Sequence, residues 1–243
     1  MSAAIRDAAA TYASQTAFTL GLPNGSQGGL TFAEVDRLSD QFAVYLREVA
    51  GFKAGDRVAI QMPNCLAYPV VVFGILKAGL IMVNTNPLYT AAEMVHQFSD
   101  SGATGLIVID LFAQKVAEVL PKTAIKTVLV VSIADLLAPL KRFLIRAVQK
   151  YVKKMVPPVT FPHPPFQAAL AAGADRMAAG ADPRLYAQSL DHNSIAALQY
   201  TGGTTGVAKG AVLTHGNLVA NTIQSLEMWK PFLRLGDEVM LTA

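Results

Sequence analysis

Short apolar runs alternate with stretches of helical spacing along the first half of the chain. The runs at residues 57–62, 80–83, 106–109 and 127–131 are mostly apolar without polar alternation, which predicts strands that are buried on both sides. Strands of this kind, separated by amphipathic helices, are typical of a parallel sheet with helices on both faces. We therefore predict an α/β fold built on a mostly parallel sheet.

Two of the predicted helices begin with the same signal. Thr31-Phe-Ala-Glu34 and Thr90-Ala-Ala-Glu93 place a hydroxyl three residues before a carboxylate, which is the spacing of a capping box. Both boxes have a structural meaning, and we assign them no function. The helices predicted between the strands cover residues 31–50, 69–77, 90–99 and 112–120.

The alternation lapses between residues 132 and 190, which we interpret as a basic amphipathic-helix insertion. A long helix is predicted over about residues 134–155, and it ends before Pro157-Pro158 because proline cannot continue a helix. At 100° per residue, its apolar side chains share one face and its bases share the other. The predicted apolar face consists of Leu136, Leu140, Phe143, Leu144, Ala147, Tyr151 and Met155.

Positive charge is concentrated in this predicted helix. Residues 141–154 hold six of the twenty Lys and Arg and no Asp or Glu, so the other fourteen bases and seventeen acids leave the rest of the chain at −3. A helix with this layout is typical of a membrane interface. One hypothesis is contact with an anionic membrane, and the commoner alternative is an apolar face that packs on its own domain. The membrane hypothesis assigns the contact to Arg142, Arg146, Lys150 and Lys153.

Composition excludes several classes of protein. A hydrophobic fraction of 52% with 15% charged residues excludes intrinsic disorder. The most apolar stretch, residues 69–83, contains Lys77 and is too short to span a bilayer. Arg6 and Asp7 stand where a secretory signal would need its apolar run, and Cys65 is the only cysteine, so we expect a cytoplasmic protein without disulfides. The bases do not alternate with aromatic residues as in a base-stacking platform, so no nucleic acid is expected as a partner.

The strand and helix pattern resumes after residue 190. Strands are predicted at residues 194–200 and 210–214, a helix at 215–229, and a last apolar run at 238–242 is interpreted as a buried strand. A chain that ends inside such a strand is expected to be part of a longer protein.

One loop between two of these strands carries candidate chemistry. It combines four glycines, three threonine hydroxyls and Lys209, and this combination predicts a cradle for a polyphosphate. Ala208 before the lysine and Gly210 after it exclude a Walker A loop. The alternative is a flexible hairpin with no ligand. The candidate nucleotide-binding residues are Tyr200, Thr201, Gly202, Gly203, Thr204, Thr205, Gly206, Val207, Ala208, Lys209, Gly210 and Ala211.

This loop, followed by Leu213-Thr-His and Asn217, resembles the phosphate-loop signature of the adenylate-forming superfamily. Segments upstream are similar to the bacterial long-chain fatty acyl-CoA synthetases in particular. These segments are Gly55-Asp-Arg-Val-Ala, Met62-Pro-Asn, Gly74-Ile-Leu-Lys-Ala-Gly79 and Val83-Asn-Thr-Asn-Pro-Leu-Tyr-Thr90.

The resemblance implies a fold, a reaction and roles for residues. Residues 1–243 would form the N-terminal part of the large domain of an adenylate-forming enzyme. The substrates would be a long-chain fatty acid, ATP and coenzyme A, with Mg²⁺ as the metal and an acyl adenylate as the intermediate. The hydroxyls of the loop and Lys209 would contact phosphates, and Thr201 would also bind the metal.

The resemblance also implies that several motifs lie beyond Ala243, so the chain by itself is expected to be inactive and to bind ATP weakly or not at all. Two alternatives stay open. One is a ligase for another carboxylate, such as a medium-chain or aromatic acid, and the other is a non-catalytic module that binds a nucleotide or a membrane. The sequence also leaves a homodimer open.

Overall fold

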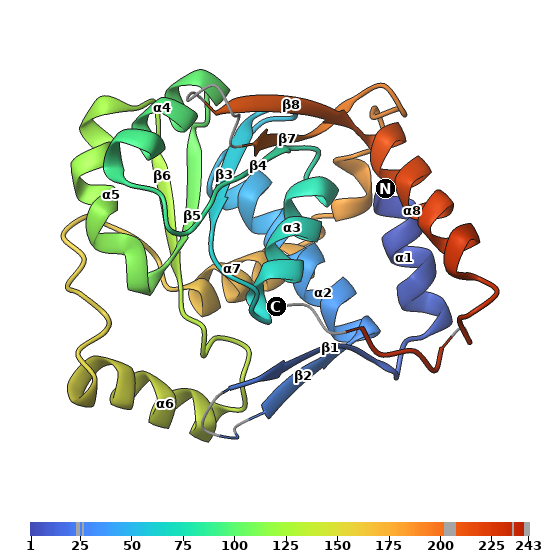
Figure 1. Ribbon diagram of the computed structural model, residues 1–243, viewed down its shortest axis with the longest axis horizontal. Helices are drawn as coiled ribbons and strands as arrows, with labels where there is room; N and C mark the ends of the chain where they lie inside the picture. Colours follow the sequence, from blue (N-terminus) through green and yellow to red (C-terminus); the bar gives the residue numbers. More distant parts are fainter. Residues whose placement is uncertain (23–24, 26, 202–207, 235, 241–243) are drawn as a thin grey trace.

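The computed structural model describes residues 1–243 except 23–24, 26, 202–207, 235 and 241–243. Its main sheet has six strands in the order β6-β5-β3-β4-β7-β8 (Figure 1). Strands β3 to β7 are mutually parallel, and β8 pairs with β7 antiparallel, so the predicted mostly parallel sheet is confirmed. The strands are β3 (Arg57–Gln61), β4 (Ile81–Asn84), β5 (Gly105–Ile109), β6 (Thr127–Val131), β7 (Ile195–Thr201) and β8 (Lys209–Thr214).

Helices cover both faces of the sheet, as predicted. Side chains alternate between the two faces along a strand, so Val58 and Ile60 of β3 lie in one apolar cluster and Ala59 lies in the other. The first cluster includes α2, α3 and α7, and the second includes α4 and α5 (Figure 1). The helices are α1 (Ser2–Thr11), α2 (Phe32–Val44), α3 (Ala67–Lys77), α4 (Ala91–Ser101), α5 (Ala113–Val119), α7 (Phe166–Ala178) and α8 (His215–Trp229).

Both predicted capping boxes are present in the structure. The Thr31 hydroxyl accepts from the Glu34 backbone N–H, and the Glu34 carboxylate accepts from the Thr31 N–H at 2.8 Å. Thr90 and Glu93 form the same pair at the start of α4. These contacts are local, which is why three residues of sequence were enough to predict them.

Two N-terminal elements were not predicted. Helix α1 precedes a separate antiparallel hairpin of β1 (Thr16–Gly21) and β2 (Gln27–Thr31). Most side chains of this hairpin are partly or fully exposed, so its sequence lacks the apolar run that marks the strands of the main sheet.

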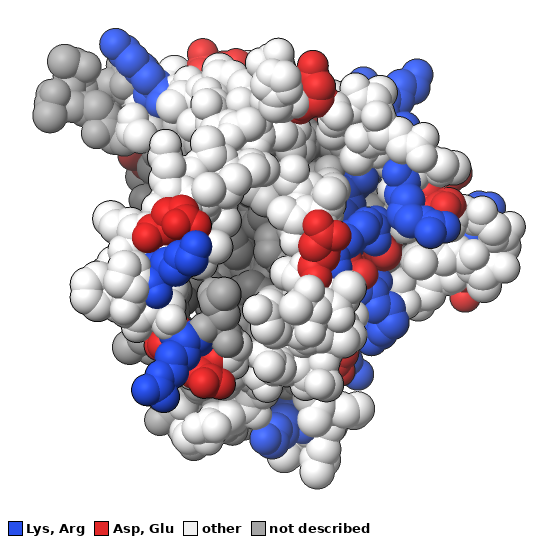
Figure 2. Space-filling view, turned by 90° about the vertical axis from the view of Figure 1, so that its right-hand side faces the viewer, with Lys and Arg blue, Asp and Glu red and all other residues white. Residues whose placement is uncertain are grey.

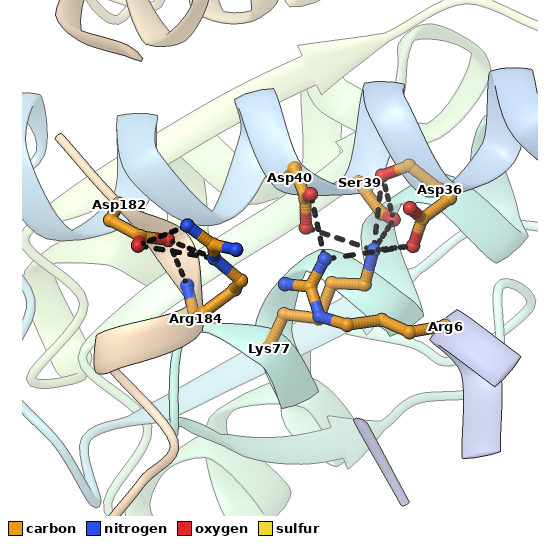
Figure 3. Close-up of polar contacts among 7 residues, drawn as sticks. All are labelled: Arg6, Asp36, Ser39, Asp40, Lys77, Asp182 and Arg184. Carbon is orange, nitrogen blue, oxygen red and sulfur yellow. Dashed lines mark hydrogen bonds and ion pairs between the residues drawn. The ribbon is translucent and has the colours of Figure 1, made fainter. Parts of the chain in front are cut away.

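A buried charge cluster joins α1, α2 and α3 (Figure 3). The Lys77 side chain is fully buried, and its Nζ lies 2.5 Å from Asp36 Oδ1 and 2.9 Å from Asp40 Oδ1. Arg6 contributes a second cation, 2.8 Å from Asp40 Oδ2. Two cations and two anions balance one another, which is the condition under which charge is tolerated in a core.

The region between residues 132 and 190 differs from the predicted long helix. Residues 133–137 form turns, Leu136 has a φ of +67°, and helix α6 begins only at Pro139 (Pro139–Ala147). Proline lacks an N–H and fits the first position of a helix, so it sets the start. A π-helical turn, η4 (Val148–Val152), continues α6. Of the predicted apolar face, Leu136 packs on the first apolar cluster, whereas Phe143 is 70% exposed, so most of the face does not pack on the described part of the chain.

The second half of the same region belongs to the core. Helix α7 packs on α2, and Phe166 and Leu170 lie in the first apolar cluster. Gly173 is required there, because a Cβ at this position would lie 1.9 Å from the backbone oxygen of Gln41.

The last apolar run was predicted as a strand over residues 238–242, of which 241 and 242 lie outside the described residues. Residues 238–240 form no strand, and Val239 is 94% exposed. A strand needs a hydrogen-bonded neighbour, and none of the strands in the described ranges pairs with this run. Within the described part of the chain, no helix is both long and apolar enough to cross a bilayer.

Candidate functional site

A crevice of about 640 Å³ lies at the carboxyl ends of the parallel strands β3, β4 and β7. In open α/β sheets this edge is where ligands bind, because loops there diverge and expose backbone and side-chain polar groups. Side chains with hydrogen-bonding groups line the crevice, among them Tyr68, Asn84, Asn86, Gln199 and Tyr200.

An amide network forms the floor of this crevice. Asn84, the last residue of β4, donates from Nδ2 to Gln199 Oε1 of β7 at 3.3 Å. The Tyr68 hydroxyl donates to Asn84 Oδ1 at 3.4 Å, and Gln97 Nε2 donates to the Asn84 backbone oxygen at 2.9 Å. Side chains held by several hydrogen bonds keep one orientation, so the polar groups here are fixed in place.

Two buried glutamines lie beside this floor. Gln61 is fully buried at the end of β3, and its Nε2 donates to the backbone oxygen of Asn86 at 3.4 Å. The Oε1 atoms of Gln61 and Gln97 are buried without a hydrogen-bond partner among the described residues. Buried polar atoms without a partner are uncommon in folded proteins, and a bound water, an ion or a ligand is one explanation for them.

Strand β7 leads from this floor to the glycine and threonine loop. Near its end, the Tyr200 hydroxyl donates to Asp100 Oδ2 at 2.5 Å, which ties β7 to the end of α4. Burial raises the pKa of Tyr200, and the hydrogen bond to the Asp100 carboxylate raises it further. Tyr200 therefore remains protonated and acts as an anchor for the strand.

Gly210 has a structural reason to lack a side chain. Its φ is not positive, and a Cβ at this position would lie 2.9 Å from the ring of Tyr200, its partner in the β7–β8 ladder. The missing side chain makes room for the Tyr200 ring, and the contact of Gly210 with a phosphate stays a prediction.

Thr201 and Lys209 face each other where β7 and β8 diverge. They form the last pair of the ladder, and both side chains are exposed. The backbone oxygen of Ala208, the residue before Lys209, lies 3.4 Å from His96 Nε2 on α4. The predicted residues Gly202, Gly203, Thr204, Thr205, Gly206 and Val207 lie outside the described residues.

The loop leads into a strand and not directly into a helix. Strand β8 runs from Lys209 to Thr214, and Thr214 then caps α8 by accepting from the Asn217 N–H at 3.1 Å. This order agrees with the exclusion of a Walker A loop and of a dinucleotide-binding turn, both of which open a helix. His215 follows the cap, and burial lowers its pKa.

No cluster of three or more His, Cys, Asp or Glu that could hold a metal ion occurs in the described part of the chain. Thr201 offers one exposed hydroxyl at the mouth of the loop.

Analysis of the sequence missed the amide floor. The available signal was an amide at or next to the end of three predicted apolar strands, namely Gln61, Asn84 and Gln199. Because the carboxyl ends of parallel strands meet at one edge of a sheet, these side chains had to lie near one another once the strand order was known.

Comparison with known proteins agrees with this geometry. The chain is 44% identical over 238 residues to a long-chain-fatty-acid--CoA ligase of Salmonella typhimurium, covering 97% of this chain and 40% of the relative. It is 44% identical over 205 residues to the protein of the same name from Haemophilus influenzae, covering 84% of this chain and 35% of that one. The chain thus spans about 40% of the length of these curated relatives.

The same fold occurs in a solved structure of a long-chain-fatty-acid-CoA ligase from Archaeoglobus fulgidus. The TM-score is 0.66 at 23% identity, over 93% of this chain and 38% of that one. The model of the AMP-binding enzyme family matches residues 5–243. With the sheet, the crevice and the loop strands of this fold in place, the chain belongs to the family of AMP-binding enzymes.

Proposed function

We propose that the chain is the nucleotide-handling part of an enzyme that converts long-chain fatty acids to acyl-CoA thioesters with ATP. The observation that carries the proposal is the pair of strands β7 and β8, which hold Thr201 and Lys209 opposite each other at the mouth of a glycine and threonine loop. High identity to long-chain-fatty-acid--CoA ligases over nearly all of this chain supports the substrate class.

The proposed reaction has two steps. In the first, a carboxylate oxygen of the fatty acid attacks the α-phosphorus of ATP, and the bond to pyrophosphate breaks. In the second, the sulfur of coenzyme A attacks the acyl carbonyl, AMP leaves and the thiol proton is lost. Negative charge grows on the leaving pyrophosphate in the first step, so positioned donors and a cation at that point speed the step.

Residues of this chain fit the first step. Lys209 is exposed beside the loop, where its ammonium can reach a phosphate without loss of a buried contact. The Tyr200–Asp100 hydrogen bond and the packing of Tyr200 on Gly210 hold the strands that carry Thr201 and Lys209. The amide floor holds the adjoining wall of the crevice.

Magnesium fits this site if most of its ligands come from the phosphates of ATP and from water, and few from the protein. Thr201 supplies one hydroxyl, and Mg²⁺ commonly binds one or two protein oxygens together with phosphate oxygens and water. We place Thr201 as the residue of this chain that would hold it. When bound, the ion would neutralise phosphate charge.

The substrate class can be tested with the protein as its gene encodes it. Pyrophosphate release is measured with saturated acids of increasing chain length and with benzoate. We expect kcat/KM to be highest for long-chain acids. A maximum at a medium-chain or aromatic acid would contradict this substrate class, and no release with any acid would favour a non-catalytic module.

The role of Lys209 is tested in the same protein by Lys209→Ala. We expect pyrophosphate release to slow by about 10²–10³-fold, the loss that follows removal of one donor to developing charge. The exposed position of Lys209 predicts an unchanged melting temperature. Lys122→Ala, at another exposed lysine, is the matched control. Unchanged release in Lys209→Ala would remove the phosphate role.

The proposal places the protein in the cytoplasm, where ATP and coenzyme A are available. It includes peripheral contact with the inner face of the cytoplasmic membrane, since a long-chain acid partitions into lipid. It leaves a homodimer as an alternative to a monomer, and sedimentation of the purified protein distinguishes the two.

A further inference from the structure

Helix α6 and the following turn η4 are oriented with their apolar side outward. Figure 1 shows α6 apart from the sheet and its helices, joined to them by two extended connections. Phe143 is 70% exposed, Tyr151 71% and Val152 74%. We call the exposed apolar set the outward face, and its main members are Leu140, Phe143, Leu144, Tyr151, Val152 and Met155.

Contacts on the opposite side fix this orientation. Ile145 packs against the first apolar cluster, and Arg146 pairs with the buried Asp135 at 3.9 Å. Lys141 donates from Nζ to the backbone oxygen of Gln27 in the β1–β2 hairpin at 2.9 Å. The helix is therefore attached by one hydrophobic and two polar contacts, and these leave the apolar side chains in solvent.

The charge around the outward face has a single sign. Residues 136–174 contain six Lys and Arg and no Asp or Glu. On the side of the molecule that carries α1 and α8, basic and acidic side chains lie next to one another instead (Figure 2). A partner of this segment must accept aromatic and aliphatic side chains and must also present negative charge.

An anionic lipid bilayer meets both requirements. We propose that the outward face of α6 and η4 inserts at the surface of such a bilayer, with the neighbouring lysines on lipid phosphates. Exposed contiguous apolar surface of this kind marks interaction sites in proteins. Aromatic and long aliphatic side chains beside lysines are the composition of helices that lie in the membrane interface. This inference deepens the peripheral membrane contact of the proposed function by naming the segment that makes it, and it rests on that contact and not on adenylate chemistry.

Flotation with lipid vesicles tests the charge requirement. The protein as its gene encodes it is mixed with vesicles of phosphatidylcholine alone or of phosphatidylcholine with phosphatidylglycerol, whose negative surface potential attracts bases. We expect binding to the anionic vesicles only, weakened by 0.5 M salt. Lys150→Gln with Lys153→Gln and Lys154→Gln is expected to lower the partition coefficient about a hundredfold, at about fivefold per base.

The matched control removes three exposed lysines elsewhere, by Lys53→Gln, Lys122→Gln and Lys126→Gln. We expect this triple variant to bind nearly as the unchanged protein does. Equal losses in the two triple variants would show that net charge alone attracts the protein, and would overturn the assignment to this segment. Binding that is absent at low salt would overturn it as well.

Insertion is tested by fluorescence. Tyr151→Trp is introduced into a protein whose other tryptophans are replaced by Phe, of which Trp229 is the one within residues 1–243, so that residue 151 carries the single tryptophan. We expect a blue shift on addition of anionic vesicles and quenching by brominated lipid. A tryptophan that is already shielded from acrylamide without vesicles would show that another part of the protein covers the face, and would overturn the proposal. Circular dichroism checks that each variant is folded. Pyrophosphate release is measured separately, so that a failure of the proposed enzyme activity can be told apart from a failure of membrane binding.

Discussion

At the scale of single residues, the sheet carries buried carboxylates that the reaction does not use. Asp110 follows β5 and is 7% exposed, and one of its carboxylate oxygens has no hydrogen-bond partner in the described structure. Burial raises the pKa of Asp110, and hydrogen bonding to Ser132 and the charge of Arg146 only partly oppose this. The folded protein thus favours the protonated carboxyl more than the unfolded chain does.

This predicts a specific pH dependence for Asp110→Asn. A carboxyl whose folded pKa is raised stabilises fully below its unfolded value of about 4, and that contribution is lost as pH rises through the folded value. Asparagine does not ionise. The free energy of unfolding of Asp110→Asn, relative to that of the unchanged protein, should therefore increase as pH rises from 4 to 7. Urea unfolding across this range measures it.

Asp191→Asn serves as a control of opposite sign. Hydrogen bonds from Ser194 hold the pKa of Asp191 below its usual value, so its contribution is present near neutral pH and lost as pH falls. Asp191→Asn should therefore be less stable than the unchanged protein near neutral pH, and this difference in the free energy of unfolding should become smaller toward pH 3. A parallel trend in both variants would contradict the assignment for Asp110.

At the scale of elements, the charge cluster at Lys77 joins three helices that the sequence does not place together. Lys77→Met leaves Asp36 and Asp40 facing each other with Arg6 as the remaining cation that forms ion pairs with them in the described structure. Removing one partner of a buried ion pair costs about 3–5 kcal/mol, and we expect a loss of this size in urea unfolding.

A compensated variant separates charge from packing. Lys77→Met with Asp36→Asn and Asp40→Asn removes the stranded charges and should recover much of the loss. Lys122→Met, at an exposed lysine, should change stability by less than about 0.5 kcal/mol. If the triple variant were no more stable than Lys77→Met, the cost would lie in the lost side-chain volume.

At the scale of the whole molecule, the proposed function makes the crevice at the ends of β3, β4 and β7 one wall of an active site. Its relatives are longer, and it covers about 40% of their length. We expect the 243-residue chain alone to form no detectable acyl-CoA from a fatty acid, ATP and coenzyme A. Mass spectrometry of the reaction measures this, with a long-chain-fatty-acid--CoA ligase of the relatives' full length as the positive control. Thioester formed by the chain alone would contradict the expectation.

The sequence by itself determined the local structure and the family. Continuous apolar runs predicted strands β3 to β6 to within a residue or two, because burial on both faces imposes one composition on a strand. The capping boxes at Thr31 and Thr90 were equally readable, since both partners lie within one turn. The phosphate-loop motif indicated a nucleotide because its glycines, hydroxyls and lysine are contiguous.

Only the tertiary structure decided the rest. A helical wheel gives α6 an apolar side but not its direction, and contacts with Gln27 and Asp135 turned that side outward. The amide floor could be predicted only from the strand order, because the pairing of β4 with β7 brings Asn84 beside Gln199, 115 positions away in the sequence. The structural reason for the missing side chain at Gly210 is its cross-strand neighbour Tyr200, whose ring lies 2.9 Å from where a Cβ would be. Each of these features depends on partners distant in sequence, and periodicity and local motifs hold no record of which distant residues meet.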